Sequence, residues 1–199
     1  MSGDNAAIAL SPKIRRRQGR TRQRILDVSA QKFVEHGFEN VSVEDIIEAA
    51  EIARSSFYRF FSNREEVLAS IIRPVFEQGM TDLEAIDTGD PAATMTGIFD
   101  TFLRLWHSNP DALRVSTRVG GVHFYLFEDV HRLFREKIAA LLDAIEPTGI
   151  FLNDNADKTG RLIARTVVSV MEVYGDDPNF DTLFHKTMTG FLLKAEEKK

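Results

Sequence analysis

The stretch from residue 42 to residue 68, SVEDIIEAAEIARSSFYRFFSNREEVL, constrains the fold more than any other part of the chain. Ser42 and Asp45 have the spacing of a capping box, so a helix is expected to begin near residue 43. The three residues after Ala50 suit a tight turn, and a second short helix is expected to follow with polar residues on its outer side. Two short helices joined in this way predict a helix-turn-helix, which points to double-stranded DNA as a partner.

A third helix is expected after this pair, and it continues into the rest of the chain. Ser62 and Glu65 form a second candidate capping box, and apolar residues recur at helical spacing behind it. Pro74 removes one backbone donor, so we expect a kink or an offset in this helix before it ends near Leu83.

The order of residues in this region resembles the N-terminal domain of the tetracycline-repressor (TetR) family of bacterial transcription regulators. The resemblance covers roughly residues 20–72 and rests on a helix from Thr21, Gly37-Phe38, Val41-Ser42-Val43, Asp45-Ile46, Ala49-Ala50, Phe57-Tyr58, Phe61, Arg64 and Leu68. Three positions depart from the family pattern: Glu51 replaces a common turn Gly, Ala53 replaces a capping Ser, and Phe60 replaces His or Tyr.

Three segments are expected: a basic flexible arm over 1–19, a helix-turn-helix domain over 20–72, and, as the resemblance implies, a ligand-binding and dimerisation domain over 73–199. The first helix is expected from about Thr21 to Glu35, with Gly37 ending it. One face of it is apolar or small and is assigned to the core: Ile25, Leu26, Ser29, Ala30 and Phe33.

Charge is unevenly distributed along the chain. The formal net charge is −5, yet residues 1–24 carry a net +6 and residues 74–199 a net −7. Basic residues therefore gather where phosphates would be met, and Arg16 and Arg17 are assigned to DNA. A basic segment alone is typical of a solvated tail, but beside a helix-turn-helix it is expected to reach along the duplex; whether it enters a minor groove stays open.

The second domain is expected to be helical throughout. The turn-rich segment Asp87–Pro91 precedes five further helical stretches, at about 92–107, 111–119, 128–145, 156–174 and 180–196. Alternating strand patterns are not evident, so the fold class is all-α: an N-terminal three-helix helix-turn-helix domain and a C-terminal helical domain. The family resemblance implies about nine helices.

An effector site is expected in the second domain, because bulky apolar side chains with a few polar tips suit a concave ligand site. The residues assigned to it are Phe99, Phe102, Trp106, His123, Phe124, Tyr125, Phe127, Met171 and Tyr174. Taken singly, Phe99, Phe102 and Trp106 are more typical of a buried helix face, and His123 is more typical of a core histidine, so the prediction rests on the whole set and on the family resemblance. The expected effector is an apolar small molecule.

A homodimer through the last two helices is also expected, because these helices carry more apolar residues than one buried face needs. The residues concerned are Ile163, Val167, Val168, Val170, Met171, Leu183, Phe184, Met188, Phe191 and Leu192. Two copies would place two recognition helices on a pseudo-palindromic operator.

The DNA contacts are assigned to the second helix of the motif and to two flanking positions. Arg54, Ser55, Ser56, Tyr58 and Arg59 are expected in the major groove, with Arg59 as the candidate for a guanine contact. Ser42 and Arg64 are expected to hold phosphates.

Other function classes find little support in the sequence. No nucleophile, phosphate-loop or metal-ligand motif is evident and there are no cysteines, so no catalytic residue, cofactor or metal is expected. No apolar run is long enough for a membrane span, and no signal core is evident, so we expect a cytoplasmic protein. The interpretation is a repressor released from its operator by its effector; an effector-free or architectural DNA-binding protein is the alternative, ahead of a small helical enzyme.

Overall fold

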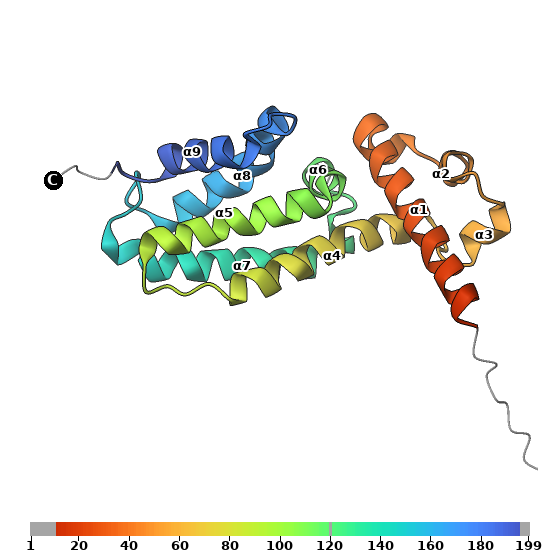
Figure 1. The fold of residues 1–199 in the computed structure, drawn as a ribbon, viewed down its shortest axis with the longest axis horizontal. Helices are drawn as coiled ribbons and strands as arrows, with labels where there is room; N and C mark the ends of the chain where they lie inside the picture. The colour runs from red at the N-terminus through yellow and green to blue at the C-terminus, as the bar shows by residue number, and fades with distance from the viewer. Residues whose placement is uncertain (1–10, 120, 196–199) are drawn as a thin grey trace, which may run out of the picture. The chain divides into compact units, whose positions relative to one another are not determined.

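A computed structural model describes residues 11–119 and 121–195. Within these residues the chain forms nine α-helices and three short 3-10 turns and contains no strand (Figure 1). The expectation of an all-α fold with about nine helices is confirmed. The chain divides after Leu68 into two compact units, four residues earlier than expected, and this division falls inside a helix.

The first unit begins with α1, Pro12–His36, the longest helix of the chain. The side chain of Ser11 accepts a hydrogen bond from the backbone of Ile14. Pro12 occupies the first turn, where a backbone N–H would have no acceptor within the helix, so its missing N–H costs no hydrogen bond. The expected core stripe from Ile25 to Phe33 is buried in full. Gly37 ends the helix with a φ of 79°, which is why a glycine stands there.

The start of α1 corrects the expected boundary near Thr21. Residues 12–19, assigned to a flexible arm, are helical, because the Ser11-Pro12 cap starts the helix nine residues earlier. Residues 1–10 of the expected arm lie outside the described residues.

The helix pair of the motif forms as expected. α2 spans Val43–Ala50 behind the predicted capping box, in which Ser42 and Asp45 bond each other reciprocally. α3 spans Arg54–Tyr58 and has no side-chain cap, because Ala53 precedes it. The turn between them depends on Glu51, which takes the left-handed conformation at φ 51° and ψ 48°.

α4, Arg64–Glu84, contains Pro74 without interruption and carries the chain from the first unit into the second. The expected Ser62–Glu65 capping box is wrong by one residue. The side chain of Asn63 accepts from the backbone of Glu66 at 2.8 Å, and the Glu66 carboxylate accepts from the backbone of Ser62 at 2.7 Å.

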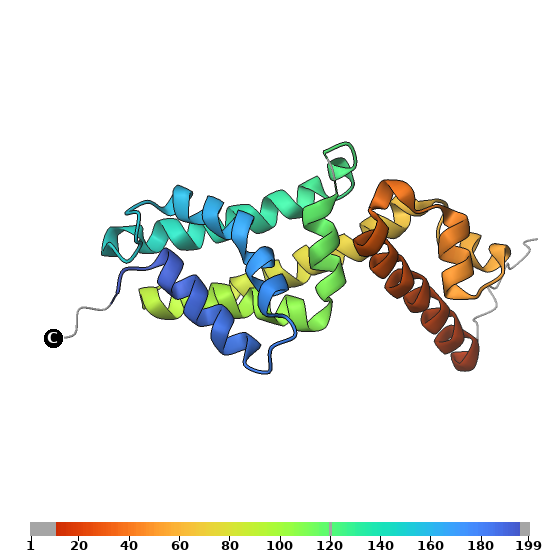
Figure 2. The ribbon, with the colours of Figure 1, turned by 90° about the horizontal axis from the view of Figure 1, so that it is seen from above.

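The second unit continues with five helices: α5, Pro91–Ser108; α6, Pro110–Arg118; α7, Glu128–Ile145; α8, Ala156–Tyr174; and α9, Phe180–Leu192. α7 and α8 pack side by side, as do α8 and α9 (Figure 2). α9 ends four residues before the expected Glu196. There the chain turns extended and pairs with the α7–α8 connection through a bridge between Phe151 and Leu193.

Because Glu51 has a left-handed backbone conformation, we expect Glu51→Gly to stabilise the protein. A residue with a Cβ is strained by about 1–2 kcal/mol in this conformation, and the extra freedom of glycine in the unfolded chain offsets part of that gain. We expect the free energy of unfolding to rise by about 0.5–1 kcal/mol in urea titrations.

Glu51→Gln is the matched control, because it keeps the backbone strain and removes only the exposed ion pair with Arg24 at 2.5 Å. It should change stability by less than about 0.5 kcal/mol. An equal rise in both variants would assign the effect to charge and not to the backbone.

Candidate DNA-binding surface and effector cavity

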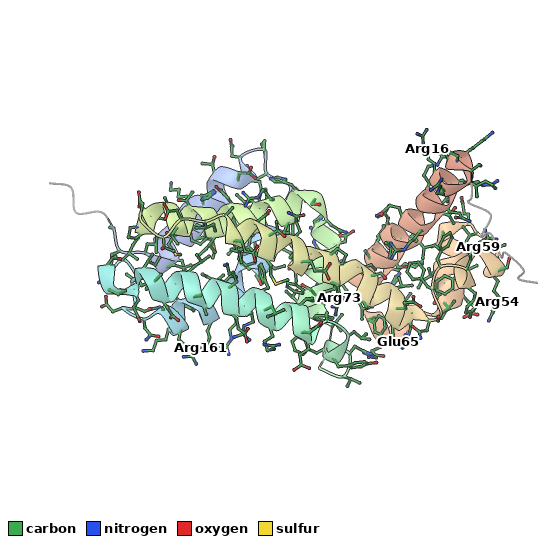
Figure 3. All side chains as sticks on the ribbon, turned by 90° about the horizontal axis from the view of Figure 1, so that it is seen from below. Arg16, Arg54, Arg59, Glu65, Arg73 and Arg161 are labelled. Atoms are coloured by element: carbon green, nitrogen blue, oxygen red, sulfur yellow. The ribbon has the colours of Figure 1, made fainter. Side chains whose placement is uncertain are left out.

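The outer side of α3 presents its polar side chains to solvent. Arg54, Ser55 and Arg59 are exposed, Tyr58 is 47% exposed, and Ser56 is half-buried. Figure 3 shows Arg54 and Arg59 projecting from this helix. Phe57 and Phe61 are buried at the helix's inner side and fix it to the first unit. The predicted division of this segment into a buried apolar face and an exposed polar face is therefore confirmed.

The two arginines of this face differ in their surroundings. Arg54 donates to Glu44 at 2.5 Å and lies over the ring of Tyr58, and the bond to Glu44 raises the pKa of the guanidinium further. Arg59 has no hydrogen-bond or ion-pair partner within the described part of the chain. Its planar donors are therefore available to a base edge or a phosphate.

The basic residues at the start of α1 are exposed and lie within a few turns of one another. Arg16 and Arg17 have no described partner, and Figure 3 shows Arg16 near the end of the helix. Arg22 lies over the Phe61 ring at 5.2 Å, and Arg24 pairs with Glu51. The free charges are thus concentrated in the first two turns.

Ser42 and Arg64, the expected phosphate contacts, both form hydrogen bonds within the fold. The Ser42 hydroxyl donates to Asp45 at 2.6 Å, and the hydrogen bonds from Ser42 lower the pKa of that carboxyl. The Arg64 guanidinium donates to the carbonyls of Phe38, Glu39 and Val41 at 2.9, 3.2 and 2.9 Å. Both side chains are engaged within the fold, so Arg64 is a structural residue that holds the segment between α1 and α2.

The second unit contains a cavity of about 430 Å³ between α7 and α8. Its interior is mainly apolar, and polar side chains from α6, α7 and α8 stand around it. The lining residues are Phe76, Phe102, Leu113, Ser116, Thr117, His131, Phe134, Arg135, Ile138, Ala139, Asp143, Ala156, Asp157, Gly160, Arg161, Ile163, Ala164, Val167 and Val168. A space of this size suits a small organic ligand.

Most of the expected effector residues do not line this cavity; of the nine, only Phe102 does. Phe99 and Trp106 instead pack α5 against α9, through Phe184 and Phe180 respectively. Phe127 and Met171 are fully buried, and Tyr174 accepts a hydrogen bond from Thr187 at 3.2 Å. These residues are helix-packing residues, which is the alternative that their spacing left open.

The remaining three lie around the connection between α6 and α7. Tyr125 is 65% exposed, His123 is half-buried, and Phe124 borders a shallow depression beside α7. Sequence reasoning missed the cavity residues His131 and Arg135. The signal that could have found the cavity is a run of small residues on facing helices, Ala139 on α7 and Ala156, Gly160 and Ala164 on α8, which leaves space between them.

His131 is the polar group most enclosed by aromatic rings at the cavity. Phe76 and Phe124 each meet it edge-on with ring centroids 5.0 Å away. Burial, and to a lesser extent the positive charge of Arg135, lowers the pKa of His131, so its imidazole is neutral at pH 7.

An ion pair joins α4 to the first turn of α7 beside the cavity. Arg73 donates to both carboxylate oxygens of Asp129, at 2.6 and 2.9 Å, and to the carbonyl of Leu126 at 3.3 Å. The hydrogen bonds from Arg73 are the main reason that the pKa of Asp129 falls from 3.8 to about 2. Phe76 and His131, which line the cavity, stand close along the chain to the two partners.

The expected dimer residues divide between the interior and the surface. Ile163, Val167, Val168, Met171, Phe184, Met188 and Leu192 are buried within the single chain. Another face of α8 and α9 is exposed or half-buried, and it consists of Leu162, Thr166, Ser169, Val170, Val173, Leu183, Thr187, Gly190 and Phe191.

Neither a metal-binding cluster nor a membrane-spanning helix is found in the described residues. No group of three or more His, Asp or Glu side chains is arranged to hold a metal ion in residues 11–119 and 121–195. In the same part of the chain no helix has both the length and the apolar character needed to cross a membrane.

The fold and its exposed α3 define a helix-turn-helix protein with a separate helical C-terminal unit. The family model for bacterial regulatory proteins of the tetR family matches residues 25–71. The match covers most of the first unit, and this part of the chain is similar to the TetR family.

Named relatives agree with this assignment. The transcriptional regulator TcmR of Streptomyces glaucescens is 33% identical over 46% of this chain and 42% of its own length, so the chain spans less than half of that relative. The transcriptional repressor KstR2 of Rhodococcus jostii is 27% identical over 67% of this chain and 69% of its own. The ketosteroid regulator KstR2 of Mycobacterium tuberculosis shares the fold, with a TM-score of 0.71 and 20% identity over 87% of this chain and 95% of its own. These relatives are regulators and not enzymes.

Arg64→Gln is expected to destabilise the first unit by about 1–3 kcal/mol, because it removes the guanidinium that donates to the carbonyls of Phe38, Glu39 and Val41. Thermal and urea unfolding would measure the loss. Arg59→Gln is the matched control and should stay within about 0.5 kcal/mol, since Arg59 has no described partner. Equal stability of the two variants would contradict the structural role of Arg64.

Asp129 is expected to titrate near pH 2, and its pKa should return toward 3.8 in Arg73→Gln. Because the folded-state pKa lies below the unfolded value, the pair stabilises the fold above about pH 4, and this stabilisation is lost as the pH falls through 2. NMR titration of the carboxyl carbon tests this. Arg132→Gln, which breaks the exposed ion pair with Glu136, should leave the pKa of Asp129 unchanged.

Proposed function

We propose that the protein is a dimeric transcriptional repressor that binds operator DNA and is released by a small molecule. The observation that carries the proposal is the exposed polar face of α3, held by buried Phe57 and Phe61. The family assignment, and relatives named as transcriptional regulators and repressors, support the same function.

DNA recognition is assigned to α3, with the start of α1 as an electrostatic partner. Arg59 is the candidate for base contact, because its donors are unoccupied, whereas Arg54 must exchange Glu44 for DNA. Tyr58, Ser55 and the half-buried Ser56 complete the face. Arg16 and Arg17 would meet phosphates, which adds affinity without sequence preference.

A second copy is required for a complete operator, because one α3 reads only a half-site. The exposed face of α8 and α9, with Val173 76% exposed and Phe191 44% exposed, suits a two-fold four-helix interface. Two recognition helices would then meet a pseudo-palindromic operator at major grooves about 34–36 Å apart or a multiple of this.

Release by a ligand is assigned to the cavity between α7 and α8. The cavity includes Phe76 of α4, and α4 also supplies the first-unit residues from Arg64 to Leu68. A ligand that binds better to one arrangement of α4 shifts the population toward that arrangement. The factor by which the ligand changes the affinity for DNA then equals the factor by which DNA changes the affinity for the ligand. The Arg73–Asp129 pair is the contact through which α7 would hold α4.

The alternative, an effector-free DNA-binding protein, requires a filled second unit. An apolar space of about 430 Å³ favours the ligand-responsive regulator instead. A regulator of this kind acts on DNA, which places it in the cytoplasm.

Arg59→Ala is expected to weaken binding to the specific operator by about 1–3 kcal/mol and to leave nonspecific DNA binding almost unchanged. The double variant Arg16→Gln/Arg17→Gln should weaken both and reduce the slope of log affinity against log salt by about two. Gel-shift titrations at several salt concentrations measure both effects, with light scattering to verify the dimer. Unchanged operator affinity in Arg59→Ala would remove this residue from base recognition.

A further inference from the structure

The polar side chains of the cavity are divided between its two ends. His131 and Arg135 lie one turn apart on α7. Asp143 lies eight residues beyond Arg135, about 12 Å along the helix, on the side of the α7–α8 connection where Asp157 and Arg161 begin α8. The cavity therefore has two chemically distinct ends.

The charges at these ends have opposite signs. At the α7–α8 connection, Arg161 is neutralised by Asp157 at 2.5 Å, and the carboxylate of Asp143 remains. At the other end, Arg135 has no ion-pair partner in residues 11–119 and 121–195.

The acids around Arg135 are occupied or remote. Asp129 is held by Arg73 and Glu136 by Arg132. Glu128 borders the depression beside α7 together with His131 and Arg135, but it does not line the cavity and is two turns before Arg135, about 10 Å along the helix. Among the charged side chains that line this end of the cavity, Arg135 is therefore the one without a paired acid.

His131 adds a directional group to this charge. Neither of its ring nitrogens has a hydrogen-bond partner within the described residues, and neutral imidazole carries one N–H donor. The charge of Arg135 that disfavours a second cation on His131 favours an anion beside it.

Behind these two groups the lining is carbon. Phe76, Phe102 and Phe134 converge there, with Phe102 and Phe134 edge-on at 5.7 Å, and Leu113, Ile163 and Val167 extend the apolar wall. A ligand that satisfies the whole site needs an apolar body and one anionic end.

We propose that the effector is an amphiphilic carboxylate whose apolar body lies between α7 and α8 and whose carboxylate is bound by Arg135 and His131. This inference rests on the proposed role of the cavity as the effector site. It differs from the wholly apolar effector that composition suggested, because a cation without a described partner stands at the cavity's edge.

Three probes with the same alkyl chain and different head groups test the proposal: dodecanoate, 1-dodecanol and dodecylamine, each titrated by calorimetry with the full-length protein below its solubility limit or micelle concentration. Dodecanoate should bind at least about 10-fold more tightly than 1-dodecanol, as expected for a charge-assisted hydrogen bond. Arg135→Gln should abolish this advantage and leave 1-dodecanol affinity within about 2-fold. Arg161→Gln makes the same charge change at the other end and should preserve the advantage.

The outcomes separate this inference from the proposed function. Equal binding of dodecanoate and 1-dodecanol to the wild-type chain, or an equal effect of the two arginine variants, overturns the carboxylate assignment while an apolar effector stands. If no probe binds and operator DNA is still bound, both the carboxylate assignment and this cavity as effector site are contradicted. Loss of DNA binding alone affects only the proposed function.

Discussion

A helix of five residues has no stability of its own, so the proposed DNA-binding surface depends on how α3 is anchored. Phe57 and Phe61 supply that anchor, and their rings lie 6.0 Å apart in the core of the first unit. Arg64 adds a second constraint from the start of α4, because its guanidinium holds the carbonyls that precede α2. The exposed side chains of α3 are therefore positioned by residues that never need to touch DNA.

The second unit contains a cavity and must remain folded around it. Large side chains pack α5 against α9. Small residues of α8 face α7 instead, and they line the cavity. The same helix that forms one wall of the cavity also presents an exposed face to solvent. The proposed effector site and the proposed subunit interface thus lie on opposite sides of α8.

Local signals in the sequence predicted local structure well. The Ser42–Asp45 capping box placed α2, and turn residues placed both ends of α7 and α8 correctly. The start of α1 was missed because the basic composition of residues 13–20 outweighed the Ser11-Pro12 cap. The end of α9 depends on a bridge to residue 151, which lies 42 residues away from its partner Leu193 and leaves no local pattern.

The candidate site was harder to predict, because periodicity identifies an apolar face but not the neighbour it meets. Phe99 and Trp106 were assigned to the effector site with a buried helix face as the alternative, and the structure packs them on α9. Arg64 has the same charge as Arg59, and only the fold distinguishes a guanidinium bound to carbonyls from one that is free.

The first turns of α1 combine several arginines with no acidic residue, at the end of the helix where the backbone dipole already favours negative charge. This arrangement weakens the helix in isolation, and the repulsion is relieved by any polyanion laid alongside it. Added salt then acts in two opposite directions: it screens the arginines from one another and lengthens the free helix, while it competes with phosphates for the same side chains. The helicity of this segment and its proposed affinity for DNA are therefore not expected to change in the same direction when salt is added.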